Sequence, residues 1–136
     1  MGFELREHTA DVAVEATGGR LGETFAAVAD GMSAAMCETV PATGERLAIE
    51  VEAESLEALL FDYLDELIYR RDVEGVLPVE NTAGVIETAD GWRISASARG
   101  VPLEEIHARE VKAVTYSDMR IEQSGGGWRA YVVLDV

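Results

Sequence analysis

The sequence is poor in cysteine, lysine and proline, and it has no long hydrophobic run. Cys37 is the only cysteine, so no disulfide can form within the chain. No apolar stretch approaches the roughly 18 residues that span a bilayer, and the first seven residues alternate like a strand rather than forming a basic, apolar leader. We therefore expect a cytoplasmic protein with neither a membrane nor a disulfide partner.

Prolines are few and linkers are absent. Three scattered prolines occur in 136 residues, and no stretch rich in proline, glycine and serine divides the chain. A hydrophobic share of 48% in a chain of this length suits one globular unit with one core. We therefore expect residues 1–136 to form a single domain.

Lysine is nearly absent from a strongly acidic chain. There are 26 acidic and 11 basic side chains, the net charge is −15, and Lys112 is the only lysine. Binding to phosphates needs cations, so we expect no stable direct binding of nucleic acid; a basic protein partner or a metal cation fits better. Such a composition is typical of a high-salt cytosol, and we interpret the source as a halophilic archaeon. An acidic protein from a GC-rich genome is the alternative.

Two segments have the apolar periodicity of helices. Residues 21–38 and 56–74 repeat apolar side chains every three to four positions. Ser55 is a good N-cap for the second helix, and Gly75 is expected to end it.

Most of the remaining chain is predicted to form strands. The candidate ranges are 3–7, 12–17, 47–53, 77–88, 92–99, 111–122 and 128–135. Asp90-Gly91 is typical of a hairpin turn. Residues 125–127, all glycine, are interpreted as a flexible connection, because no P-loop lysine or helix follows them. This order predicts an α+β fold, with two helices packed on a mixed, mostly antiparallel β-sheet.

Acidic residues near the two ends of the chain are candidate metal ligands. His8 and Asp11 lie three residues apart between two predicted strands, and an Asx-type turn with a capping histidine is the simpler explanation of this spacing. Asp135 adjoins the terminal carboxylate of Val136, a pair that suits Ca²⁺ or Mg²⁺ or a frayed, solvated end. If the last strand is central in the sheet, Asp11, Asp135 and Val136 could form one oxygen-rich site.

Two interpretations are open for each of the other candidate polar residues. Lys112 suits contact with a phosphate, a nucleotide or a carboxylate, or it occurs there by chance. Asp62, Asp65 and Glu66 share a helix face that is either a docking surface or simply solvated. No nucleophile–base pair, GxGxxG or Cys/His spacing is visible, so a stand-alone enzyme has little support.

Taken together, these segments resemble the archease family. The resemblance covers nearly the whole chain. It rests on His8-Thr-Ala-Asp11-Val, the leucine-rich segment 59–69, Val111-Lys-Ala-Val-Thr-Tyr116, and the ending from Trp128 through Leu134-Asp135-Val136. One position departs from the family pattern: Asp65 stands where archeases often carry asparagine.

The resemblance implies a function that spacing alone does not. Archeases are non-catalytic activators of the RtcB-type RNA ligase of tRNA splicing; they promote guanylylation of the ligase histidine and its turnover, and can broaden nucleotide use. A divalent metal ion, Ca²⁺ or Mg²⁺/Mn²⁺, would be bound by Asp11, Asp135 and Val136 with His8 in support, and Lys112 would act at the ligase active site. The alternatives are a chaperone-like or scaffolding module that binds clients through the second helix, and a metal-dependent hydrolase.

Overall fold

A computed structural model describes residues 2–7 and 11–136, so His8 lies outside the described residues. The elements follow one another as β1 (Gly2–Glu7), β2 (Asp11–Gly18), α1 (Leu21–Met36), β3 (Glu45–Ala53), α2 (Leu56–Glu74), β4 (Val76–Glu87), β5 (Trp92–Pro102), a 3₁₀ turn (Leu103–Glu105), β6 (Ala113–Ser124) and β7 (Gly127–Asp135). The helices and strands expected from periodicity are confirmed, with shifts of a few residues at their ends.

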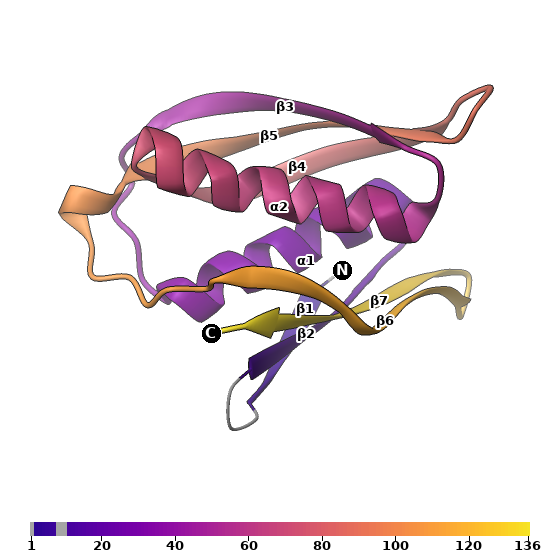
Figure 1. The fold of residues 1–136 in the computed structure, drawn as a ribbon, viewed down its shortest axis with the longest axis horizontal. Helices are drawn as coiled ribbons and strands as arrows, with labels where there is room; N and C mark the ends of the chain where they lie inside the picture. The colour runs from indigo at the N-terminus through magenta and orange to yellow at the C-terminus, as the bar shows by residue number, and fades with distance from the viewer. Residues whose placement is uncertain (1, 8–10) are drawn as a thin grey trace.

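Two antiparallel sheets enclose the two helices (Figure 1). Sheet A has the order β1-β2-β7-β6 and sheet B the order β3-β5-β4, and the described strands pair only in antiparallel fashion. The expected α+β class, with two helices on mostly antiparallel strands, is confirmed. The structure adds that the strands divide between two sheets, with the helices filling the space between them.

Helix α1 is buried on almost every side because it lies between β2 and β4. Phe25, Val28 and Ala29 are fully buried. Small residues allow this close packing: a Cβ atom on Gly22 would stand 2.3 Å from the carbonyl oxygen of Ala83 in β4. Glycine at this position therefore sets how closely the helix approaches sheet B.

Helix α2 begins and ends where its sequence predicts. The Ser55 hydroxyl accepts a hydrogen bond from the backbone N–H of Ala58 at 3.1 Å, and Gly75 adopts the left-handed conformation, with φ of 67°. Leu60, Tyr63 and Leu64 are fully buried on one side of the helix, while the opposite side is exposed. In the described part of the chain, no helix is long and apolar enough to cross a membrane.

The hairpin between β6 and β7 is closed by glycine residues. Gly125 and Gly126 have φ of 57° and 85°, the pattern of a type I′ turn, which joins two strands tightly. A Cβ atom on Gly127 would stand 2.4 Å from the carbonyl oxygen of Gly18. Gly125 and Gly126 therefore form a tight turn, and Gly127 begins β7 packed against the chain. The expected connection between two strands is confirmed.

Candidate functional site

Two carboxylates meet at one end of sheet A. Strand β7 is central in this sheet, between β2 and β6, as the sequence analysis required for a joint site. Asp135 of β7 pairs directly with Asp11 of β2 on one side and with Ala113 of β6 on the other. Residues directly opposite in antiparallel strands place their side chains on the same face, about 4.5–5.5 Å apart at Cβ. Asp11 and Asp135 are therefore neighbours, although they lie near opposite ends of the chain.

The Asp11 side chain has an unsatisfied oxygen. Its Oδ1 atom is buried and has no hydrogen-bond partner among the described residues, whereas Asp135 is exposed. Like charges directly opposite one another destabilise a strand pair, and a buried carboxylate oxygen without a partner adds a further cost. A bound cation would offset both, and carboxylate oxygens are the ligands that Ca²⁺ and Mg²⁺ prefer. The residues present therefore fit a divalent cation.

The carboxylate pair alone is an incomplete ligand set. No group of three or more His, Cys, Asp or Glu side chains gathers within the described residues. Val136 is half-buried and packs against the hydrophobic core. Calcium takes six to eight oxygen ligands, including main-chain oxygens and water. Main-chain carboxylate and carbonyl oxygens near Val136 would have to complete the coordination.

Lys112 lies beside this pair. Its backbone N–H donates a hydrogen bond to the carbonyl oxygen of Asp135 at 2.7 Å, just before β6 begins, and its side chain is exposed. The structure thus brings together three of the residues that the sequence singled out, namely Asp11, Asp135 and Lys112. The backbone of Lys112 is therefore fixed at the end of the strand that carries Asp135, and its exposed ammonium group is free to contact an anionic group on a partner.

A buried arginine that the sequence analysis did not recognise supports the segment leading to Lys112. Arg71, in the last turn of α2, is only 7% exposed. Its Nη1 atom donates to the carbonyl oxygen of Val111 at 2.8 Å, and its Nε and Nη2 atoms lie 2.9 Å from Oδ1 of Asp72. Arg71 follows Leu64 and Leu67 at helical spacing on the buried side of α2. The periodicity of the sequence therefore indicates that this arginine faces inward.

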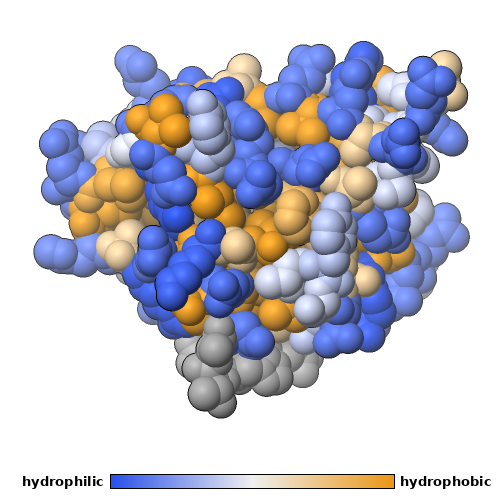
Figure 2. Space-filling model, in the orientation of Figure 1, coloured by the Kyte–Doolittle hydropathy of each residue, from blue (hydrophilic) through white to orange (hydrophobic). Residues whose placement is uncertain are grey.

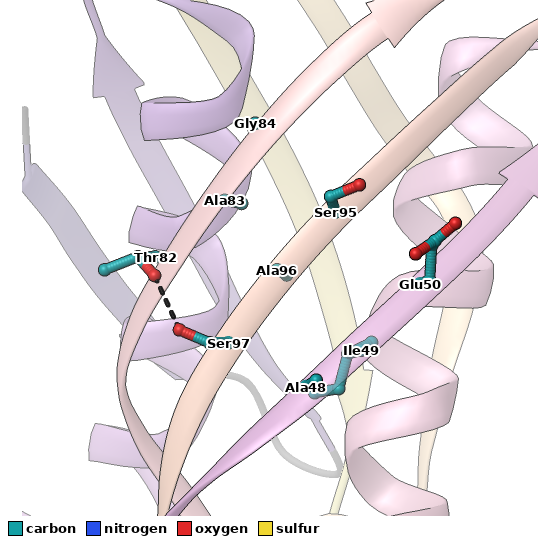
Figure 3. A pocket seen from close by; sticks show the side chains of 9 residues that line it. All are labelled: Ala48, Ile49, Glu50, Thr82, Ala83, Gly84, Ser95, Ala96 and Ser97. Atoms are coloured by element: carbon teal, nitrogen blue, oxygen red, sulfur yellow. Dashed lines mark hydrogen bonds between the residues drawn. The ribbon is translucent and has the colours of Figure 1, made fainter.

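A separate hollow lies on the outer face of sheet B (Figure 3). It is lined by small side chains, including Ala48, Ser95 and Gly84, and the hydroxyls of Thr82 and Ser97 lie 2.9 Å apart. Sheet B is on the other side of the helices from sheet A (Figure 1). This hollow is therefore remote from the carboxylate pair, and its lining offers Glu50 as its only ionisable side chain.

Fold and site together define a small α+β domain in which two antiparallel sheets enclose two helices and an acidic pair marks the end of the central strand of sheet A. The sequence model of the Archease protein family (MTH1598/TM1083) matches residues 3–136. The chain belongs to the archease family.

Individual relatives agree along nearly the full length. The chain is 41% identical over 139 residues to a protein named archease from Thermococcus gammatolerans, and the match covers 98% of both chains. The solution structure of protein 1598 of Methanobacterium thermoautotrophicum is similar, with 36% identity, a TM-score of 0.85 and 99% of each chain covered. A crystal structure from Thermotoga maritima, described as an archease and possible chaperone, shares the fold at 21% identity, with a TM-score of 0.62 over 98% of this chain and 96% of that one.

Proposed function

We propose that this chain is a non-catalytic activator of an RtcB-type RNA ligase and promotes guanylylation and turnover of that enzyme in tRNA splicing. The observation that carries the proposal is the meeting of Asp11, Asp135 and Lys112 at one end of sheet A. These residues lie in the motifs on which the resemblance to archeases rests. A protein partner with a cationic, nucleotide-binding cleft is the complement of such a site on a chain with net charge −15.

A divalent cation forms part of the proposal. Asp11 and Asp135 would hold it, with the terminal carboxylate of Val136 as a further ligand, because the unpaired Asp11 oxygen and the opposed carboxylates favour a cation there. When bound, the ion supplies positive charge that neutralises the two aspartates and can attract phosphate oxygens. Ca²⁺, Mg²⁺ and Mn²⁺ all accept such ligands.

The charged residues of the chain itself have separate roles in this proposal. The acidic surface steers the domain toward a cationic cleft, which raises the rate of encounter. Lys112 reaches a phosphate or carboxylate in that cleft with a compact, flexible ammonium group. Arg71 holds the carbonyl oxygen of Val111 and so fixes the backbone from which Lys112 projects.

Single-turnover guanylylation of the ligase with GTP tests the proposal. Asp11→Asn, Asp135→Asn and Lys112→Ala should each lower the rate of guanylylation in the presence of this protein by about tenfold or more, because each removes a charged contact in a desolvated site. Glu50→Gln, on the outer face of sheet B, is the control and should activate like the parent. Full activation by all three site variants would refute the assignment.

Removal of the metal provides a second test. Protein dialysed against a chelator should lose the cation, and titration of Ca²⁺ or Mn²⁺ should restore it to a single site, measured by calorimetry on this protein alone. Asp135→Asn should weaken that binding. Equal binding by parent and variant would mean that Asp135 is not a ligand.

A chaperone-like module remains the second candidate. The Thermotoga maritima relative carries that description, and large exposed apolar side chains on α2 and β6 of this chain, at Tyr69, Val73 and Tyr116, are consistent with client binding. This function predicts activity that depends on those apolar residues and is insensitive to Lys112 and Asp135. A pull-down that recovers many unrelated proteins, rather than mainly the ligase, would favour it.

A further inference from the structure

A tyrosine in β6 packs onto α2 beside an irregular stretch of its strand. The register between β6 and β7 shifts between Thr115 and Arg120, and Asp118 within this interval has a positive φ of 57°. Tyr116 stacks on Phe61 of α2, with ring centroids 4.2 Å apart and an angle of 6° between the rings, yet it remains 55% exposed. One flat aromatic face is therefore held in place and offered to solvent.

Apolar side chains continue along the exposed side of α2. Tyr69 is 55% exposed and Val73 is 62% exposed. Together with Asp62 and Asp65 they follow at steps of three and four residues, so they share one helix face about 16 Å long. Figure 2 shows hydrophobic and weakly polar residues among charged ones on the side of the molecule where Figure 1 places α2 and β6. We call Phe61, Asp62, Asp65, Tyr69, Val73 and Tyr116 the aromatic–acidic face.

The two aspartates of this face have no described counter-ion. Glu66, one turn further along α2, is bound to Arg70 at 2.9 Å, but none of the ion pairs formed by the described residues includes Asp62 or Asp65. Burial, and then the charge of Asp62, raise the pKa of Tyr116 above its ordinary value. The stacked rings therefore lie in a negative field. Lys112 lies only four residues before Tyr116, so a partner reached by Lys112 is close to this face.

We propose that the aromatic–acidic face docks an arginine-bearing segment of the partner ligase. A guanidinium group is the chemistry that fits, because it stacks on an exposed aromatic ring and at the same time donates paired hydrogen bonds to a carboxylate. A lysine ammonium group can lie over a ring and donate to a carboxylate, but it neither stacks flat on the ring nor forms the paired hydrogen bonds. This inference rests on the proposed function and adds a second contact to it: the end of sheet A acts at the ligase active site, whereas this face supplies affinity.

The affinity of the full chain for the ligase tests the inference. Tyr116→Ala, and separately Asp62→Asn combined with Asp65→Asn, should each raise the Kd by about tenfold, since aromatic anchors and desolvated charges dominate interfaces. The aspartate double variant should also show a weaker dependence of Kd on salt. Tyr116→Phe keeps the stacked ring and should bind like the parent. Glu50→Gln combined with Glu87→Gln removes the same charge from sheet B and should also bind like the parent.

Activation curves separate this inference from the proposed function. Variants of the aromatic–acidic face should need more protein for half-maximal guanylylation but reach the parent's maximum, whereas Lys112→Ala should lower the maximum itself. If the parent binds and activates the ligase and the face variants match it in Kd, the docking surface is wrong while the proposed function stands. If the parent neither binds nor activates the ligase, both fail.

Discussion

At the scale of single residues, polar atoms buried without partners carry the most information. Among the described residues these are Oδ1 of Asp11, the hydroxyl of Tyr63 and Oδ1 of Asn81. Asn81 is nonetheless anchored, because its backbone N–H and its side-chain amide donate to Oδ1 of Asp30 at 3.0 and 2.8 Å. Asp11 lies at the candidate metal site, whereas Tyr63 is deep in the core. The two therefore call for different tests.

Removal of the Tyr63 hydroxyl should stabilise the fold. The ring is fully buried and its hydroxyl has no described partner, so Tyr63→Phe deletes an unsatisfied group and should raise the free energy of unfolding by about 1 kcal/mol. Urea unfolding of parent and variant measures this. A loss of stability would show that the hydroxyl is bonded in solution, for example to an ordered water molecule.

The same residue predicts a dependence on alkaline pH. Burial, and then the charge of Asp30, raise the pKa of Tyr63 far above its ordinary value of about 10. A raised pKa means that the folded state favours the neutral phenol, so this contribution is fully present below pH 10 and is lost as the pH rises beyond it. Stability of the parent should therefore fall more steeply above pH 10 than that of Tyr63→Phe. Parallel curves would contradict this assignment.

Arg71 and Arg70 are adjacent in sequence but should behave very differently. Arg71→Met removes a buried donor from the carbonyl oxygen of Val111 and should cost about 2–3 kcal/mol of unfolding free energy. Exchange of the Lys112 amide hydrogen, which is bonded to Asp135, should become faster. Arg70→Met breaks partly exposed pairs with Glu66 and Glu74 and an exposed hydrogen bond to the carbonyl oxygen of Ala48, and should change stability by less than about 1 kcal/mol. Equal effects of the two would refute the special role of Arg71.

At the scale of elements, the helices and strands were predictable because their signals are local. Ser55 and Gly75 bracket α2 through the contacts that cap helices generally. The division into two sheets was not predictable, since periodicity does not state which strands pair. The register shift around Asp118 was not predictable either, because positive φ is uncommon for any non-glycine residue and is held there by its surroundings.

The site was predictable in part. The resemblance and simple chemistry point to Asp11, Asp135 and Lys112. The register of β2 with β7 pairs the two aspartates, and the backbone N–H of Lys112 is bonded to the carbonyl oxygen of Asp135. The role of Arg71 is harder to predict from the sequence, because a cation in the last turn of a helix also suits the helix dipole. Phe61 and Tyr116 lie within the motifs that carry the resemblance, but their stacking depends on a tertiary contact.

The close packing of α1 against β4 can be tested by substituting the glycine at the contact. Gly22→Ala would force a Cβ atom to within 2.3 Å of the Ala83 carbonyl oxygen, so it should destabilise the protein by roughly 1–3 kcal/mol, the usual cost of overpacking. Gly84→Ala is the matched control, because a Cβ atom there meets nothing within 4 Å. Thermal unfolding of both variants measures the difference. Two equally stable variants would mean that α1 and β4 can separate at little cost.

At the scale of the whole molecule, the large negative net charge governs how stability depends on salt. With −15 on 136 residues, self-repulsion opposes the compact state, and salt should relieve it as the Debye length falls from about 10 Å at 0.1 M to about 3 Å at 1 M. We expect the Tm to rise from dilute buffer to molar KCl. A variant with Glu57→Gln, Glu87→Gln and Asp90→Asn, all exposed positions, should show a shallower rise. Equal stability across this range would contradict the high-salt interpretation.

The central place of β7 in sheet A also bears on biosynthesis. β7 follows every other element along the chain, yet both β2 and β6 pair with it. During translation, the β1–β2 hairpin and α1 are therefore synthesised first. One edge of β2 then stays unpaired until β7 leaves the ribosome. Such non-local pairing slows folding and exposes an aggregation-prone edge. The same pairing joins Asp11 to Asp135, so the acidic pair forms only on molecules whose synthesis has reached β7.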